Sequence, residues 1–312
     1  MSANMRFSRI LGFVACFAIT AGATPAFPAE IAILVSQDIP PYKQVISSFT
    51  AGVGKVPVSI HDMKGDLADG RNYLGGAAER GARLIVAVGS KAVAAASVFA
   101  DRLPVMALMA PEPAKILESA RMGFGITLTS NPSDQFDFLH ELLPEAKTIG
   151  VIYNSELISD ELSDGLTAAR ARYRHRYRVV EEKITSPDEA PGAFRRAVET
   201  SDAIWLVFDE TVVTEQAIKY LFELALGKGI PVIGFSKKTV QKGALFTAYS
   251  DYGEIGPQAA KLAKKVLAGS APADIGFMYP ETNGYYVNRR VAEHLRIPLV
   301  KRFAGMWVEY YE

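Results

Sequence analysis

Residues 229–269, GIPVIGFSKKTVQKGALFTAYSDYGEIGPQAAKLAKKVLAG, decide how the rest of the chain can be arranged. Two short apolar runs, 230–235 and 244–249, flank a polar loop and predict two strands. After them the apolar residues recur at helical spacing, and Asp251 and Glu254 have the spacing of a capping box. The order strand, loop, strand, helix therefore places a long amphipathic helix directly after a strand.

Outward from this stretch, strands and helices alternate along nearly the whole chain. The first series has predicted strands at 31–35, 56–60, 84–88 and 105–109, with helices beginning near Pro41 and at 67–80 and 91–100. The second has helices at 135–143, 162–172, 190–200 and 214–227 and strands at 148–153, 177–184, 203–208 and 231–235. Successive strand–helix units imply right-handed crossovers. The sequence therefore predicts an α/β protein with two Rossmann-like lobes, each built on a parallel sheet.

Three segments do not fit into either series and are predicted to cross between the lobes. The glycine-containing segment 123–131 separates the two series. A helix at 252–268 and a strand at 275–279 are expected to return to the first lobe, and a helix at 288–295 to the second. We therefore expect three hinge crossings, with the first lobe formed by 30–128 plus 250–279. The second lobe would be formed by 129–249 plus 280–312.

Several motifs resemble one family of known proteins. They are IPV at 230–232, KGAL at 242–245, YSDY at 249–252, IGPQAAKLAKKVLAG at 255–269, VNRRVAEHL at 287–295 and GFGITLTSNPSDQFDFLHELLPEAKTIGVIYN at 123–154. In this order they resemble the substrate-binding proteins of ABC transporters, in the family of the tryptophan- and tyrosine-binding lipoproteins. The resemblance implies a type I periplasmic binding protein fold, a small-molecule ligand and a membrane permease as partner. The sequence departs from the family at 110–112, where Ala-Pro-Glu replaces a Thr-Asp-Pro type of loop.

The N-terminus has the layout of a secretory signal peptide. Arg6 and Arg9 precede an apolar run at 10–19, and small residues follow up to Ala29. We therefore expect residues 1–29 to be removed and the mature protein to be periplasmic. Cys16, the only cysteine, follows Val-Ala as in part of a lipobox, so lipid anchoring through Cys16 is the less favoured alternative.

Composition and motifs argue against several classes of function. The chain of 312 residues has 49% hydrophobic and 22% charged residues and a formal net charge of zero, which gives no reason to expect a polyanionic partner. The arginines at 170–178 are interpreted as a solvated edge rather than a nucleic-acid site, because two acidic residues follow them. No phosphate loop, nucleophile elbow or metal-ligand spacing occurs. We therefore expect a monomer that is not an enzyme and needs no cofactor, metal or nucleic acid.

Candidate ligand-binding residues can be taken from the ends of the predicted strands. In open α/β sheets, ligands bind beyond the carboxyl ends of the strands, and two facing sheets form a cleft. The polar and aromatic residues at these positions are Ser36, Gln37, Tyr42, Ser90, Lys91, Asn154, Asp209, Thr211, Ser236, Tyr249 and Asp251. They are predicted to bind the ligand.

Each of the strongest candidates also has a purely structural interpretation. Ser90 begins a helix and could bind a carboxylate or serve only as its N-cap. Asp209 could pair with an ammonium group or cap the next turn. Asp251 could likewise pair with an ammonium group or only cap the helix that follows it. The resemblance favours function, because family members carry a small hydroxyl residue at the Ser90 position, next to the ligand's carboxylate, and an acidic residue at the position of Asp209. Aromatic residues near the cleft, Tyr42, Phe235, Tyr249 and Tyr252, could stack on a flat ligand or pack the hinge.

The sequence thus predicts the substrate-binding component of an ABC importer, which closes on a small polar solute such as an amino acid or a related carboxylate. Two alternatives remain: a periplasmic sensor subunit that presents ligand-induced closure to a membrane receptor, and an exported enzyme with an unrecognised site.

Overall fold

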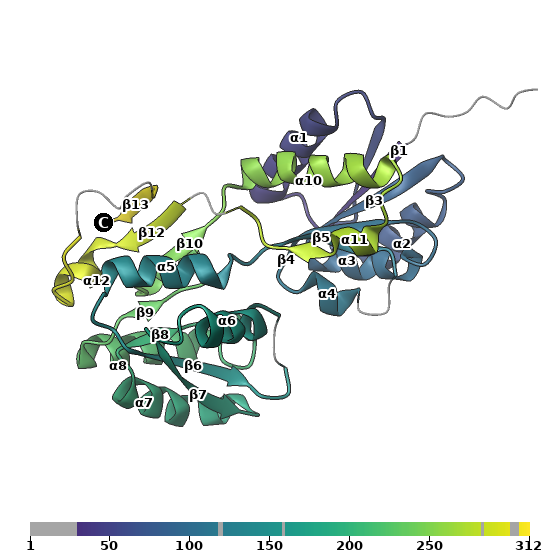
Figure 1. Cartoon of the computed structure of the whole chain (residues 1–312). Helices are drawn as coiled ribbons and strands as arrows, with labels where there is room; N and C mark the ends of the chain where they lie inside the picture. Colours follow the sequence, from purple (N-terminus) through teal and green to yellow (C-terminus); the bar gives the residue numbers. More distant parts are fainter. Residues whose placement is uncertain (1–29, 118–120, 158–159, 282–283, 300–305) are drawn as a thin grey trace, which may run out of the picture.

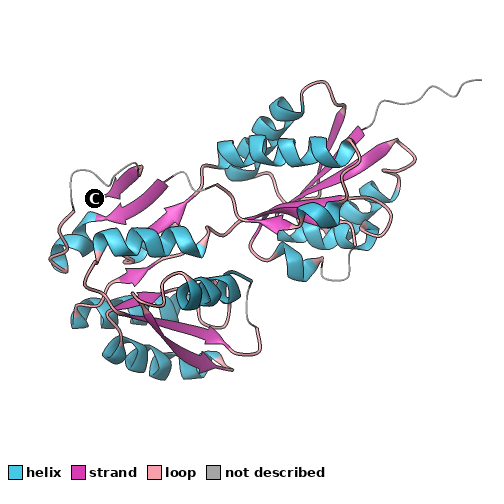
Figure 2. Ribbon diagram, in the orientation of Figure 1, coloured by secondary structure: helices cyan, strands magenta, loops and turns pink. Residues whose placement is uncertain are grey.

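The computed structural model describes residues 30–117, 121–157, 160–281, 284–299 and 306–312. The predicted signal peptide and Cys16 lie outside these residues. Two sheets with helices on both faces form two lobes that are linked by hinge segments (Figure 1). Strands and helices alternate in both lobes (Figure 2), which confirms the predicted α/β fold class.

The first lobe is a parallel sheet with the strand order β11-β5-β4-β3-β1-β2. Its strands are β1 (Glu30–Val35), β2 (Val58–Asp62), β3 (Ala82–Val88), β4 (Val105–Ala110), β5 (Gly123–Thr127) and β11 (Phe277–Met278). Its helices are α1 (Pro40–Val53), α2 (Leu67–Gly75), α3 (Ser90–Ala96), η1 (Ser97–Phe99), α4 (Pro113–Ile116), α10 (Tyr252–Leu267) and α11 (Pro272–Ile275). The central strand β4 is buried along its whole length, because apolar clusters cover both faces of the sheet.

The second lobe has the strand order β13-β12-β10-β9-β8-β6-β7. Its strands are β6 (Thr148–Asn154), β7 (Arg178–Ile184), β8 (Ala203–Trp205), β9 (Val232–Ile233), β10 (Phe246–Tyr249), β12 (Gly284–Asn288) and β13 (Val308–Tyr311). Its helices are α5 (Pro132–Leu142), α6 (Asp160–Ala171), η2 (Pro187–Glu189), α7 (Ala190–Thr200), α8 (Glu215–Lys228), α9 (Lys237–Lys242) and α12 (Arg289–His294). All neighbouring strands are parallel except β10 and β12, since β12 enters the sheet from the opposite direction.

The chain passes between the two sheets three times: after β5, after β10 and after β11. The first crossing segment is joined to strand β10, which precedes the second crossing, by a hydrogen bond from Ser130 Oγ to the carbonyl oxygen of Ala248 (3.0 Å). In the third, Tyr279 Oη donates to Asp164 Oδ2 of α6 (2.8 Å), and Glu281 N donates to Gln258 Oε1 of α10 (3.3 Å). The third segment is therefore hydrogen-bonded to both lobes. The predicted residue boundaries of the lobes remain predictions.

The long helix α10 packs against α1 in the first lobe, as Figure 1 shows. Two glycines allow the helices to approach closely. A Cβ atom at Gly256 would lie 2.0 Å from Ser48 Oγ and 2.5 Å from Phe49 N, and one at Gly52 would lie 2.6 Å from Ala260 Cβ. Asp251 begins α10 as its N-cap, and its Oδ1 accepts from Gly253 N (2.7 Å). The apolar face of α10 completes the core that begins with β1 and α1.

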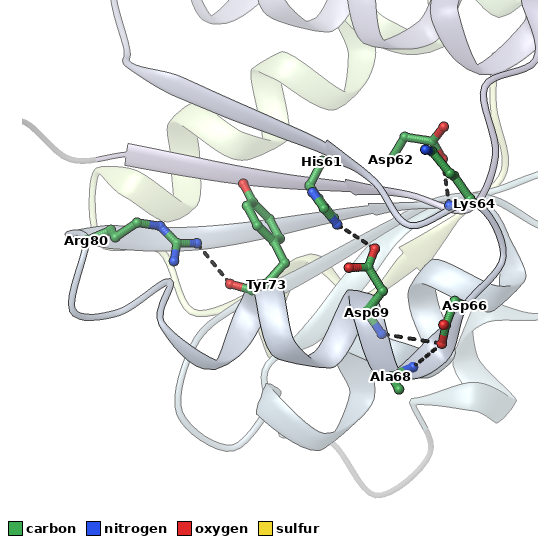
Figure 3. A network of polar contacts seen from close by, with 8 residues as sticks. All are labelled: His61, Asp62, Lys64, Asp66, Ala68, Asp69, Tyr73 and Arg80. Atoms are coloured by element: carbon green, nitrogen blue, oxygen red, sulfur yellow. Dashed lines mark hydrogen bonds and ion pairs between the residues drawn. The ribbon is translucent and has the colours of Figure 1, made fainter.

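Polar contacts join the edge strand β2 to α2, away from the hinge (Figure 3). His61 Nε2 lies 2.7 Å from Asp69 Oδ2, and the His61 ring stacks on Tyr73 with the ring centres 4.5 Å apart. Asp66 caps α2, because its Oδ1 accepts from Ala68 N (2.8 Å). These contacts fix the loop that follows β2.

Several short elements differ from the sequence-based predictions. The loop predicted after the strand at 231–235 contains α9, which Ser236 and Thr239 start with a capping box. The strand predicted at 275–279 is shortened to β11, because α11 occupies the residues before it. Of the predicted strand 203–208, only β8 (Ala203–Trp205) pairs with neighbouring strands. Strand β13 was not predicted at all.

Candidate ligand-binding cleft

A cavity of about 930 Å³ lies at the hinge between the two lobes. Residues that follow β4, β5, β8, β9 and β10 line it, together with the start of β13 and the first turn of α10. Because β12 and β13 run opposite to β10, the start of β13 lies at the same edge of the second sheet as the ends of the other strands. The cavity is therefore an interlobe cleft at the carboxyl edges of both sheets, as the fold class predicts.

The first-lobe wall of the cleft is acidic and partly aromatic. It contains Gln44 of α1 and Asp251, Tyr252 and Glu254 at the start of α10. Gln44 Nε2 donates to Asp251 Oδ1 (3.0 Å), which joins α1 to the N-terminus of α10. Asp251, Tyr252 and Glu254 are all exposed, so two carboxylates and a phenol face the cavity. This wall can receive a cationic group.

The second-lobe wall is aromatic and carries two lysines. Phe208 and Phe235 line it and pack edge to face, with their ring centres 5.6 Å apart. Lys237 and Lys238, in the first turn of α9, also line the cavity. Trp307 completes this wall from the residue before β13. The wall therefore offers flat apolar surface beside positive charge.

Lys237 sits in a cage of aromatic rings and a carboxylate. Its Nζ lies 2.6 Å from Glu309 Oε2, 3.8 Å from the centre of the Tyr249 ring and 5.0 Å from that of Tyr286. Burial raises the pKa of the Tyr249 hydroxyl, the Glu309 carboxylate raises it further, and the hydrogen bond to Trp307 lowers it. Tyr249 thus remains a neutral phenol at physiological pH.

One hydroxyl of the hinge is buried without a partner. Ser250 lines the cavity, and its Oγ has no hydrogen-bond partner among the residues that the structure describes. A buried hydroxyl that lacks a hydrogen bond costs about 1–3 kcal/mol. A solute or a water molecule in the cleft would satisfy it.

Three of the predicted site residues line this cavity: Ser236, Tyr249 and Asp251. Ser236 is also engaged locally, because its Oγ accepts from Thr239 N (3.3 Å) at the start of α9. Asp251 combines the predicted capping role with a position on the cleft wall.

A second group of predicted residues surrounds Gly89, at the end of β3. Ser36 Oγ is buried and accepts from Ala92 N (2.8 Å). A Cβ atom at Gly89, whose φ is 90°, would lie 2.6 Å from Tyr42 Oη, so glycine leaves room for that phenol. Burial raises the pKa of Tyr42, and nearby Tyr252 raises it further. The N-cap alternative for Ser90 was wrong: Gly89 is the N-cap, and Ser90 is exposed in the first turn of α3.

Gln37 and Lys91 belong to the same end of the first sheet. A Cβ atom at Gly65 would lie 3.3 Å from Lys91 Nζ and 3.6 Å from Gln37 Nε2. Gln37 and Tyr42 also line a smaller cavity of about 450 Å³ between α1 and β2, which is separate from the interlobe cavity in its lining residues.

The remaining predicted residues, Asn154, Asp209 and Thr211, form a network at the ends of β6 and β8. Asp209 is 8% exposed. Its Oδ2 accepts from Asn154 N (2.7 Å), and its Oδ1 accepts from the backbone N–H groups of Thr211 (2.8 Å) and Val212 (3.4 Å). Asn154 Nδ2 donates to Thr211 Oγ1 (3.0 Å). The carboxylate thus ties two loops together and has little surface left for a ligand.

Sequence reasoning missed several residues of the cleft wall, among them Gln44, Phe208, Lys237, Ser250, Trp307 and Glu309. Phe208 and Ser250 each lie beside a predicted site residue, so a wider window around the strand ends would have included them. Trp307 and Glu309 had no such indication, because the strand that places them was not predicted.

Neither a metal site nor a membrane-spanning helix occurs among the described residues. No group of three or more histidine, cysteine or acidic side chains there is arranged to hold a metal ion. In the same part of the chain, no helix combines the length and apolar character needed to cross a membrane.

Comparison with known proteins gives consistent matches. Residues 61–304 match the family described as ABC transporter substrate binding protein. A tyrosine-binding protein of Clostridioides difficile (strain R20291) is 28% identical over 198 residues, which is 62% of this chain and 56% of that relative. The match thus spans little more than half of the relative's length.

Solved structures extend the likeness to most of the chain. The ligand-free, open structure of a substrate binding protein with adhesive properties from Clostridium difficile has a TM-score of 0.70 at 20% identity, covering 91% of this chain and 99% of that one. An ABC domain in complex with L-Trp from Streptococcus pneumonia has a TM-score of 0.57 at 19% identity, covering 88% and 96%. At these identities the structures establish the fold alone. The match over residues 61–304 shows that this chain belongs to the ABC transporter substrate binding proteins, a family of solute-binding proteins rather than enzymes.

Proposed function

We propose that this protein is the periplasmic solute-binding subunit of an ABC importer, and that it closes on an amino acid or a related carboxylate and delivers it to a membrane permease. The observation that carries the proposal is the cavity of about 930 Å³ that is lined by both lobes and by the hinge. A rotation about three short crossing segments would enclose a solute there. The predicted signal peptide supports the periplasmic location, and we propose a monomer.

The charges on the two walls support a solute with both an amino and a carboxylate group. Asp251 and Glu254 stand on the first-lobe wall and Lys238 on the second. Asp251 is exposed, whereas Asp209 is buried and accepts backbone hydrogen bonds, so we propose Asp251 as the partner of the ammonium group. We propose Ser90 for the carboxylate: it is exposed in the first turn of α3, outside the residues that line the cavity, so the solute would reach it only as the lobes close. Asp209 would then support the loops of the second-lobe wall.

The tyrosine-binding relative supports amino acids as the first solutes to test. A thermal-shift screen would use the purified protein, refolded to remove any solute carried through purification. The panel would contain amino acids, short peptides, sugars and aromatic carboxylates. A solute at one hundred times its Kd adds about 2.7 kcal/mol of stability, which shifts Tm by roughly 2–4 °C in a protein of this size. We expect a shift with one class of amino acid, and no shift with any member would contradict the proposed function.

Calorimetric titration of variants then tests the residues. Asp251→Asn removes the charge and keeps a good N-cap, so α10 stays intact while affinity falls by roughly tenfold or more. Glu223→Gln, on the outer face of α8, is the matched control and should bind like the wild type. Unchanged affinity in both Asp251→Asn and Ser90→Ala would show that the residue assignment is wrong, even if a solute binds.

A further inference from the structure

We propose that Trp307 of the second lobe and Tyr252 of the first form an aromatic clamp that stacks on a ring of the solute when the lobes close. The inference rests on the proposed function and adds to it which residues select the solute. The chemistry required of the solute is a ring with an exposed face, either an aromatic ring or the apolar face of a cyclic polyol.

Exposure of large apolar side chains is the first observation. Trp307 is 69% exposed and is the most exposed large hydrophobic residue that the structure describes. Tyr252 is 37% exposed, and both residues line the same interlobe cavity from opposite lobes. Leu128 of the hinge, also exposed, lies on this cavity as well. Exposed apolar surface that gathers in one cavity marks a binding site.

The position of Trp307 is fixed although its ring is exposed. Strand β13 runs parallel to β12, and Tyr285 N donates to the carbonyl oxygen of Trp307 (2.8 Å). A Cβ atom at Gly284 would lie 2.8 Å from that oxygen and 2.9 Å from Trp307 Cδ1, so only glycine leaves room for the indole there. The backbone of Trp307 is therefore set by the sheet while its ring extends into the cleft, so less ordering is needed when a solute binds.

Neighbouring aromatic surface is already occupied. Lys237 Nζ lies 3.8 Å from the centre of the Tyr249 ring and is paired with Glu309 (2.6 Å). A solute ring would have to displace this ammonium group in order to stack on Tyr249. Trp307 offers a larger ring without that cost, and Tyr252 lines the same cavity from the other lobe. The geometry thus assigns stacking to Trp307 and Tyr252 rather than to Tyr249.

The two tryptophans of the chain make the inference directly measurable. Trp205 is 1% exposed in the core of the second lobe, where its Nε1 donates to Gln135 Oε1 (3.0 Å). Acrylamide should therefore quench Trp307 and spare Trp205 in the ligand-free protein. The tryptophans would be excited at the red edge of the indole band, so that tyrosine does not emit. Addition of L-tyrosine should then protect Trp307 from quenching. A parallel titration with myo-inositol distinguishes an aromatic ring from a cyclic polyol.

Variants separate stacking from folding. Trp307→Phe should keep most of the affinity but lose the ligand-induced protection, and Trp307→Ala should weaken binding by roughly tenfold or more. Tyr252→Ala should weaken binding of the same solute. Val98→Ala removes an apolar side chain that is exposed outside the cleft and should change nothing. The Tm of each variant reports on its fold.

Two results would overturn the clamp while leaving the proposed function intact. One is binding of a ring-containing solute, shown by calorimetry, without protection of Trp307. The other is wild-type affinity for that solute in Trp307→Ala. If neither ring probe binds while an acyclic amino acid does, the ring requirement is wrong and the importer function stands. Absence of binding by every solute in the panel would overturn both.

Discussion

Tyr177 shows how one buried hydroxyl can affect stability in either direction. Its side chain lies in the second-lobe core and is 5% exposed, and its Oη has no hydrogen-bond partner among the described residues. Burial raises the pKa of Tyr177 to about 12; nearby Arg176 lowers it and Asp137 raises it. An unpaired buried hydroxyl costs about 1–3 kcal/mol, so the phenol is tolerated rather than required.

We therefore predict that Tyr177→Phe is neutral or stabilising at neutral pH. The pKa of Tyr177 in the folded state is above the unfolded value of 10. Its contribution to the free energy of unfolding is therefore fully present below pH 10 and is lost as the pH rises toward 12. The loss approaches about 1.4 kcal/mol per pH unit for this one proton. Urea unfolding across this range should show a shallower decline in the variant than in the wild type.

Tyr153→Phe is the contrasting variant. Tyr153 Oη donates to Glu181 Oε2 (2.7 Å), so its removal should cost about 1 kcal/mol at neutral pH. Equal losses in the two variants at neutral pH would contradict the assignment of an unpaired hydroxyl to Tyr177.

Among the elements, the contact between α1 and α10 depends on residues without side chains. Gly256 of α10 meets the backbone of α1, where a Cβ atom would lie 2.5 Å from Phe49 N and 2.7 Å from the carbonyl oxygen of Val45. A flexible side chain could change its rotamer to make room for the Cβ atom, but backbone atoms of a helix cannot. The two helices therefore need glycine at this point to keep their spacing.

Gly256→Ala should destabilise the protein by roughly 1–3 kcal/mol, because the added methyl group forces the helices apart. The matched control is Gly227→Ala in α8, where a Cβ atom meets nothing within 4 Å and the substitution should stabilise by about 0.5 kcal/mol. Thermal unfolding of both variants measures the difference. A gain in Tm for Gly256→Ala would show that the helices can adjust.

Long elements were predicted from the sequence more accurately than short ones, which were predicted too long or missed. The run that forms β3 and the apolar face of α10 carry a periodic pattern over many residues, so their type and order were predicted correctly. Strand β9 lies inside the predicted strand 231–235 but is shorter than predicted, and helix α9 is too short to show a helical period. Ser236 and Tyr249 of the cleft follow from strand ends. Trp307 does not, since its place depends on pairing between β12 and β13.

On the scale of the whole molecule, the two lobes have separate cores. Each of the four apolar clusters contains residues of one sheet and its helices, and none in the described part of the chain includes strands of both. The lobes are joined by three crossing segments and a few hydrogen bonds such as that between Tyr279 and Asp164. Such lobes can unfold with different free energies.

We predict two overlapping transitions in calorimetry of the ligand-free protein. A solute bound between the lobes contacts both, so saturation should raise the lower transition and merge it with the upper one. Gly256→Ala assigns the transitions, because it should lower only the one that belongs to the first lobe. A single ligand-free transition with equal calorimetric and van't Hoff enthalpies would contradict this picture.

The first lobe is also completed late in synthesis. Its core needs Ile255, Ala259 and Ala263 of α10, which the ribosome adds only after β6 through β10 of the second lobe have been made. At about 5–20 residues per second, strands β1 to β5 wait on the order of ten seconds for this helix. Over that interval the nascent first lobe cannot close its core. A nascent chain whose first lobe lacks α10 stays available to chaperones, which would suit the export that we propose.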